Sequence, residues 1–252
     1  MRYFLDISYK GTNYSGWQKQ QNAPNTVQQE LEKALSMILG EETPCTGSGR
    51  TDTGVHARQQ MVHFDAREGL NQTFLYGLNG ILPYDIAVNR LLCAVNPRLR
   101  ARFDATSRKY EYRIVRRKSP LDWEFAMWIR YPLDVPRMNE ASKILTEYRD
   151  FGAFCKAHGA NLTHICEIKQ AFWEEKPNRE LLFTIEADRF LRGMVRAIVG
   201  TLLLVGAGKI SIPEFVSIIE SQDRGKAGAA ADAKGLSLVE VNYPAGSFEE
   251  IA

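Results

Sequence analysis

Apolar and polar residues follow two rhythms along the first hundred positions, and these predict strands and helices in turn. Residues 3–8 alternate with the period of two that is typical of a strand. Apolar residues at 27–38 recur at helical spacing, after a capping box formed by Thr26 and Gln29 and before a terminating Gly40. The remaining elements, which complete a β-α-β-α-β order, are strands at 61–64 and 86–95 and a helix at 71–78.

The second half of the chain has the same mixed texture without repeating the sequence. A polar and basic stretch at 96–107 separates the halves, and we place the boundary near Asp104, which predicts domains at 1–104 and 105–252. Strands and helices that mix without regular βαβ spacing favour an α+β fold with antiparallel sheets. The elements predicted after the boundary are strands at 108–115, 166–173, 181–187 and 236–241, and helices at 136–148, 190–205 and 213–221.

Composition narrows the class of protein. With 44% hydrophobic and 25% charged residues, the chain has the make-up of a soluble globular protein. Its formal net charge is only +2, so affinity for nucleic acid must come from local clusters of Lys and Arg. No signal peptide is visible before Asp6, and no uncharged run reaches the about 20 residues that a membrane span needs. Four scattered cysteines give no disulfide framework, so we expect a cytoplasmic protein with no membrane segment.

The densest chemistry lies in the glycine-rich stretch 47–57. Three glycines in eight residues let the backbone turn tightly and approach a ligand, while Arg50 and Asp52 project together. Thr51 and His56 add a hydroxyl and an imidazole to the same loop. A surface turn with an ordinary ion pair explains this spacing equally well.

Basic residues gather at two further places. Six cations between Arg108 and Lys118 are interleaved with Tyr110 and Tyr112, a pattern that suits phosphate contacts and base stacking but also a solvated strand face. The second cluster consists of Arg189, Arg192 and Arg196. Their spacings of three and four predict that all three lie on one side of the helix expected to begin there.

Cysteines and histidines at 155–166 suggest a zinc site as an alternative, but Cys155, His158, His164 and Cys166 depart from the usual ligand spacing. We prefer a substrate-facing loop around residues 151–154, and the role of the loop at 155–166 stays open. The sequence contains no phosphate-binding loop, dinucleotide fingerprint or nucleophile elbow, so we expect no metal and no cofactor.

A lone carboxylate among guanidinium groups would stay negatively charged at neutral pH. Such a group suits a nucleophile or the electrostatic stabilisation of a sugar cation, and it suits a general acid badly. Ordinary glycoside hydrolysis uses a second carboxylate, and none stands out beside Asp52. The residues therefore indicate a glycosidic bond handled by one acid.

In several sequence blocks the chain resembles the tRNA pseudouridine synthase A (TruA) family. The stretch Gly49-Arg50-Thr51-Asp52-Thr53-Gly54-Val55-His56-Ala57 is similar to the family signature, and 6–18 resembles its opening. Later blocks that match in the same order are 108–112, 190–196 and 234–238, so the resemblance covers nearly the whole chain.

The resemblance implies conversion of uridine to pseudouridine at positions 38, 39 and 40 of the tRNA anticodon stem-loop, without metal or cofactor. It implies that Asp52 is the catalytic carboxylate, Arg196 its basic partner, and Tyr110 the ring that stacks on the uracil. Leu236 would be the opposite apolar wall, and Arg50 would fill the gap left by the extruded base. The other residues expected to bind substrate are Thr51, His56, Arg108 and Arg192.

The family also implies two ferredoxin-like, RRM-like α+β domains whose antiparallel sheets join into one larger sheet, with the active-site cleft between them, and a homodimer. Two other functions stay open at this point: a non-catalytic RNA-binding protein, and a nucleoside hydrolase or glycosylase that would release free uracil.

Overall fold

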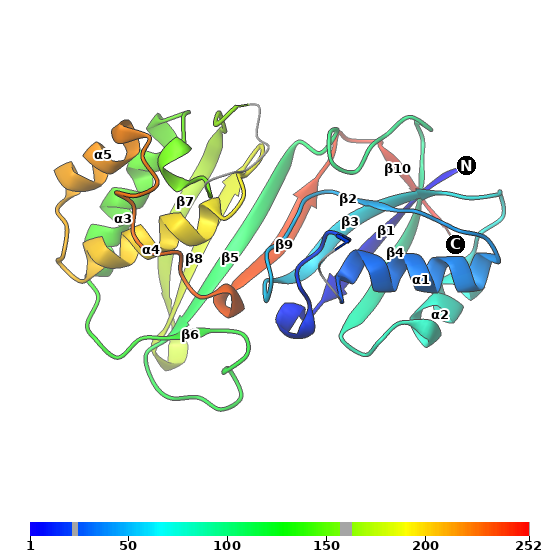
Figure 1. Cartoon of the computed structure of the whole chain (residues 1–252), viewed down its shortest axis with the longest axis horizontal. Helices are drawn as coiled ribbons and strands as arrows, with labels where there is room; N and C mark the ends of the chain where they lie inside the picture. Colours follow the sequence, from blue (N-terminus) through cyan, green and yellow to red (C-terminus); the bar gives the residue numbers. More distant parts are fainter. Residues whose placement is uncertain (22–24, 157–162, 252) are drawn as a thin grey trace. The chain divides into compact units, whose positions relative to one another are not determined.

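The computed structural model describes residues 1–21, 25–156 and 163–251 (Figure 1). The chain divides into two compact units, the first comprising Met1–Thr106 and Leu238–Ala252 and the second Ser107–Ser237. Each unit combines helices with mainly antiparallel strands, so the predicted α+β class is confirmed.

The first unit is built on an antiparallel sheet in which β1 (Arg2–Tyr9) lies between β3 (His56–Asp65) and β4 (Ile86–Ala94). The short strand β2 (Thr46–Gly47) pairs with β3, and β10 (Phe248–Glu250) pairs with β4. Two helices belong to this unit, α1 (Val27–Leu39) and α2 (Gln72–Ile81), together with the single turn η1 (Gly11–Asn13).

Local signals begin and end these helices as the sequence predicts. The Thr26 side chain accepts a hydrogen bond from the Gln29 amide at the start of α1, and Gly40 ends the helix in the left-handed region at φ 75°. Asn71 caps α2 by accepting hydrogen bonds from Thr73 and Phe74. These caps confirm the predicted helix starts.

Strand β1 is buried on both faces. Tyr3 stacks on Phe64, which in turn stacks on Phe74 of α2. On the other face Phe4 packs edge-on against Tyr243 and Phe248 of the C-terminal segment. The structure therefore differs from the predicted division at 104/105, because the last fifteen residues return to the first unit to cover this apolar face.

The second unit contains an antiparallel sheet in which β8 (Glu180–Ala187) lies between β5 (Ser107–Val115) and β7 (Ile168–Lys176). The two-residue strand β6 (Met127–Trp128) pairs with β5 in parallel. The helices and short turns of this unit are α3 (Val135–Ile144), η2 (Leu145–Glu147), η3 (Gly152–Phe154), η4 (Pro177–Arg179), α4 (Met194–Gly206), α5 (Ile212–Ser221) and η5 (Ala233–Gly235). Strand β9 (Leu236–Asn242) begins in this unit and continues into the first.

The helix predicted from residue 190 starts later than expected. Gly193 takes a left-handed conformation at φ 72°, and α4 begins after it at Met194. Arg189 and Arg192 consequently precede the helix, and only Arg196 of the predicted cluster lies on it. The prediction that the three arginines share one helix face is wrong for this reason.

No helix in the described part of the chain combines the length and apolar character needed to cross a membrane.

Candidate active site

The predicted catalytic carboxylate lies in a tight turn between β2 and β3. The Val55 amide donates to the Asp52 carbonyl at 3.1 Å and closes the turn, in which Gly54 has a positive φ of 78°. On the β2 side, the Ser48 amide donates to the Met61 carbonyl at 2.7 Å. Asp52 is half-buried, so the residue remains partly accessible to solvent.

The segment between β1 and α1 clamps this turn through backbone contacts that only glycine permits. A Cβ on Gly11 would lie 2.0 Å from the Val55 carbonyl oxygen, and one on Gly16 would lie 2.6 Å from that of Thr51. The Gly11 amide donates to Nδ1 of buried His56 at 3.0 Å. The His56 imidazole therefore joins the start of β3 to η1, and its predicted contact with substrate stays a prediction.

Thr51 and Arg50, the two residues before Asp52, point into different environments. Thr51 is buried, and its hydroxyl lies 2.8 Å from the hydroxyl of Tyr9 on β1. Arg50 is exposed, and its Nε donates to Oε1 of Gln18 at 3.1 Å. Asp52 thus follows one residue anchored in the core and one cation held at the surface.

In the second unit, the predicted stacking residue Tyr110 lies on β5 opposite Ile185 of β8. Its ring meets Phe190 edge-on, with 5.2 Å between the ring centroids and an interplanar angle of 90°. Tyr110 is 8% exposed, so its ring plane is fixed by packing. The next tyrosine on the same face, Tyr112, donates to the Asp232 carbonyl at 2.8 Å, and burial raises its pKa.

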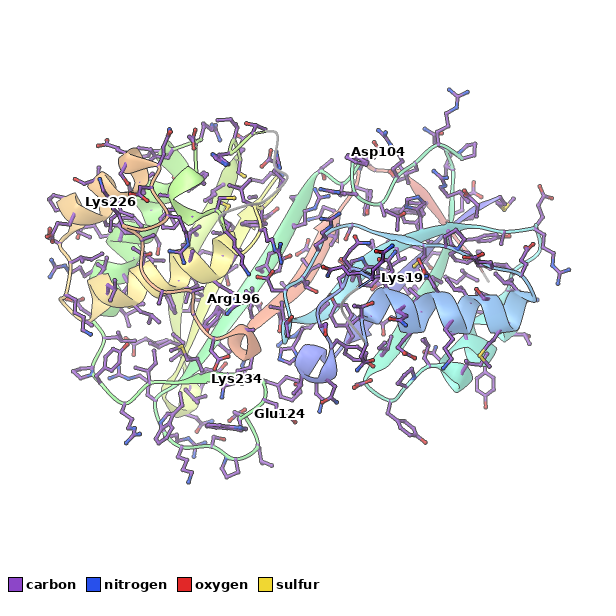
Figure 2. All side chains as sticks on the ribbon, in the orientation of Figure 1. Lys19, Asp104, Glu124, Arg196, Lys226 and Lys234 are labelled. Carbon is purple, nitrogen blue, oxygen red and sulfur yellow. The ribbon has the colours of Figure 1, made fainter. Side chains whose placement is uncertain are left out.

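Arg196 lies near the start of α4 and joins the helix to the loop that follows α5 (Figure 2). Its Nε donates to the Ala231 carbonyl at 2.7 Å, and the Ala231 amide donates back to the Arg196 carbonyl at 2.9 Å. The same loop leads through η5 to Leu236, which is buried. Its path is narrow, because a Cβ on Gly235 would lie 2.7 Å from the Tyr112 ring.

The basic cluster at 108–118 is smaller as a binding surface than the sequence predicts. Arg108 is buried and donates to the Asp188 carbonyl at 2.7 Å. Arg113 makes a two-pronged ion pair with Glu180, with N–O distances of 2.8 and 2.9 Å. The sequence could not reveal these partners, which lie on β8 or directly after it. The exposed cations of this cluster are Arg117 and Lys118.

Arg192, predicted to bind substrate, is exposed in the segment before α4, and its carbonyl accepts a hydrogen bond from the Lys156 amide.

The alternative zinc site includes His158, which lies outside the described residues. Cys155 and Cys166 are buried, and burial raises the pKa of Cys166 to about 12. Within 1–21, 25–156 and 163–251, no three His, Cys, Asp or Glu side chains are grouped to hold a metal ion.

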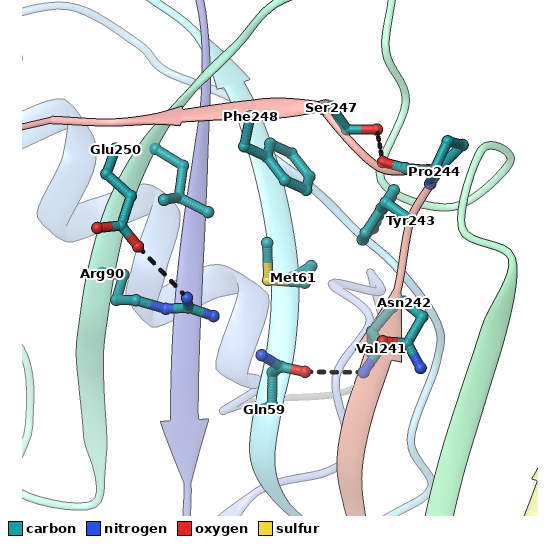
Figure 3. A pocket seen from close by; sticks show the side chains of 12 residues that line it. Gln59, Met61, Arg90, Val241, Asn242, Tyr243, Pro244, Ser247, Phe248 and Glu250 are labelled. Atoms are coloured by element: carbon teal, nitrogen blue, oxygen red, sulfur yellow. Dashed lines mark hydrogen bonds and ion pairs between the residues drawn. The ribbon is translucent and has the colours of Figure 1, made fainter.

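A hollow of about 300 Å³ lies on the face of the first unit's sheet that the C-terminal segment covers (Figure 3). Gln59 accepts a hydrogen bond from the Val241 amide at 2.8 Å, and Arg90 pairs with Asp6 at 2.7 Å. Arg90 also lies 3.8 Å from Glu250, so its charge is balanced by two carboxylates. None of the predicted site residues lines this hollow.

Comparison with known proteins supplies the class. A family model described as tRNA pseudouridine synthase matches residues 7–88 and 143–244. The chain is 47% identical over 250 residues to the tRNA pseudouridine synthase A of Bacteroides fragilis, with 98% of each chain covered. The proteins of the same name from Bacteroides thetaiotaomicron and Francisella tularensis subsp. novicida are 47% and 39% identical, covering 99% and 98% of this chain and 93% and 96% of theirs.

These matches place the chain among the pseudouridine synthases, isomerases that act on uridine within RNA. Within that class it belongs to the tRNA pseudouridine synthase A (TruA) family. Asp52 and Arg196 fall inside the matched residues, whereas Tyr110 falls between the two matched segments.

Proposed function

We propose that this protein converts uridine to pseudouridine at positions 38, 39 and 40 of the tRNA anticodon stem-loop, with Asp52 as its catalytic carboxylate. The observation that carries the proposal is the match of the family model to two segments of the chain, which contain Asp52 and Arg196. The half-buried, clamped turn at Asp52 supports it, because a group that acts on one bond must be held in position.

The reaction is an isomerisation and needs no external oxidant or reductant. The bond between N1 and C1′ breaks, the uracil turns within the site, C5 bonds to C1′, and the C5 proton is lost while N1 gains one. Asp52 assists by attack on C1′, through a glycal, or through a base adduct. We propose Tyr110 as the ring that stacks on the uracil and Arg196 as the basic partner of the catalytic carboxylate.

The roles of the other residues follow from the cost of extruding a base. Taking a base out of a stem costs a few kcal/mol, and stacking on an aromatic ring returns roughly 1–3 kcal/mol. Tyr110, with its ring held by Phe190, is the proposed stacking partner, and Leu236 is the opposite wall. Arg50 is exposed beside the Asp52 turn and is proposed to fill the gap in the stem.

The remaining predicted contacts are assigned by position. Arg192 is exposed and is proposed to contact the RNA backbone. Thr51, His56 and Arg108 are buried and are proposed to support the residues that contact the substrate. We propose a cytoplasmic homodimer that acts without metal or cofactor.

The test uses three tRNA substrates, each with a single uridine tritiated at C5, which lies at position 38, 39 or 40. The full chain should release tritium to water from each substrate without releasing free uracil. Asp52→Asn should abolish release while retaining tRNA binding, and the exposed Glu68→Gln should behave as the wild type. Free uracil would identify a glycosylase. Full release by Asp52→Asn would show that another group is the catalytic one.

A further inference from the structure

A second, smaller hollow lies beside the Asp52 turn, entirely within the first unit. Its volume is about 80 Å³, and its lining comes from four parts of the chain: the segment before α1, the first turn of α1, the segment around β2, and the loop after β4. The lining residues that matter here are Trp17, Gln18, Gly47, Gly49, Arg50 and Arg102. The charged residues among its lining are the two arginines, so the hollow carries positive charge.

Its size decides what class of group it can take. Pockets for small molecules and cofactors have volumes of roughly 300–1,000 Å³. A hollow of about 80 Å³ cannot hold a nucleoside, but it suits a compact charged group. Guanidinium groups recognise phosphate through paired hydrogen bonds, which points to a phosphate.

Gly49 leaves open space on its side of the hollow, which a bound group can occupy. Its φ is not positive, and a Cβ built on it would meet no atom within 4 Å. Neither backbone conformation nor packing therefore requires glycine at this position. Gly47, two residues earlier, is different, because its Cβ would lie 2.6 Å from the Trp17 ring.

Arg50 lines the hollow, and a hydrogen bond to Gln18 fixes its Nε atom. Gln18 donates from Nε2 to Gln28 at 2.7 Å, which leaves its Oε1 to accept from Arg50 Nε at 3.1 Å. Gln28 is itself fixed by donating to Glu32 at 3.0 Å. Among the described residues, no hydrogen bond or ion pair engages the terminal Nη atoms of Arg50, which stay available for a ligand.

We propose that this hollow binds a phosphate of the tRNA backbone over the open surface of Gly49, held by Arg102 and, until a base is extruded and the Arg50 side chain enters the gap in the stem, by the Nη atoms of Arg50. The inference rests on the proposed function, since it names a part of the same substrate. It adds Arg102 as an RNA-binding residue and gives a reason for the glycine at position 49.

The test measures tRNA binding by the full chain as a function of salt concentration. Arg102→Gln should weaken binding and lower the slope of log K against log salt by about 0.7–0.9, the value for one lost phosphate contact. Arg100→Gln is the matched control, because Arg100 and Arg102 both lie over the Phe103 ring and only Arg102 lines the hollow. The control should keep the wild-type slope.

Gly49→Ala supplies a second test that does not remove a charge. Its added methyl group meets open space, so thermal stability should be unchanged while tRNA binding weakens and the slope falls by the same about 0.7–0.9. A wild-type slope in both Arg102→Gln and Gly49→Ala would overturn the phosphate site. Loss of tritium release by the wild type would instead overturn the proposed function, so the two failures are distinguishable.

Discussion

The buried hydroxyl pair between Tyr9 and Thr51 offers a direct test of how the fold positions the Asp52 turn. The two oxygens are 2.8 Å apart, and both residues are buried. Among the described residues, Tyr9 is the partner of the Thr51 hydroxyl, and Thr51 immediately precedes Asp52. Tyr9→Phe removes one oxygen and leaves a buried hydroxyl without its partner.

The magnitude follows from the cost of an unpaired buried group, about 1–3 kcal/mol. Tyr9→Phe and Thr51→Val should each lower the free energy of unfolding by that amount. The double variant should be less destabilised than the sum of the two single variants, with a coupling of about 1 kcal/mol, because the Thr51 hydroxyl that Tyr9→Phe leaves unpaired is then removed as well. If the loss of this coupling raises the activation free energy by the same about 1 kcal/mol, tritium release should slow about fivefold.

The assay is urea unfolding of the four proteins in the cycle, together with tritium release at saturating tRNA. Tyr3→Phe on the same strand is the control, since the Tyr3 hydroxyl donates to the Arg67 carbonyl and accepts from the Leu70 amide, each at 3.4 Å and away from the Asp52 turn. Strictly additive effects in the double variant would refute the pair as an anchor. A rate for Tyr9→Phe equal to that of Tyr3→Phe would refute its role in positioning Asp52.

Three further predictions concern packing, protonation and thiol reactivity. Gly200→Ala should destabilise the second unit in thermal unfolding by about 1–3 kcal/mol despite the higher helix propensity of Ala, because its Cβ would lie 1.8 Å from the Ala229 carbonyl oxygen. Burial lowers the pKa of His63, so the unfolded chain binds a proton that the folded one does not. Stability should therefore fall as the pH drops below about 6.5, and urea unfolding of His63→Gln should show a shallower decline. Half-buried Cys93 should react with a thiol reagent in the native protein faster than buried Cys166, whose pKa is raised to about 12, as peptide mapping of the labelled chain would show.

Much of this fold could be predicted from the sequence because its signals are local. The cap at Thr26, the glycine that ends α1 and the cap at Asn71 each act within one turn, and the structure has all three. The sequence predicts too early a start for α4 because Phe190 and Leu191 extend its apolar pattern, whereas Gly193 turns the backbone left-handed before the helix begins. A short-range pattern cannot show which conformation a glycine takes.

The pairings that shape the site are long-range, and the pattern does not encode them. Alternation on β5 predicts one buried face, and Tyr110 and Tyr112 lie on it. The same alternation says nothing of Glu180, which neutralises Arg113 from the neighbouring strand. It also says nothing of β10, since three residues are too few to show a period. Register and partner come from tertiary packing, which requires the structure.

A carboxylate on a glycine-rich turn presents a conflict that the first unit resolves with the segment before α1. Glycines let the turn at Asp52 form, but they also give an unsupported loop the most freedom to move. Misplacing a reacting group by about 1 Å can cost on the order of a hundredfold in rate. Gly11 and Gly16 let the clamping segment approach the backbone of the turn more closely than any other residue could. The segment at 10–17 is therefore as much a part of the site as the turn that carries Asp52, and a Cβ at Gly16 should impair catalysis without touching the substrate.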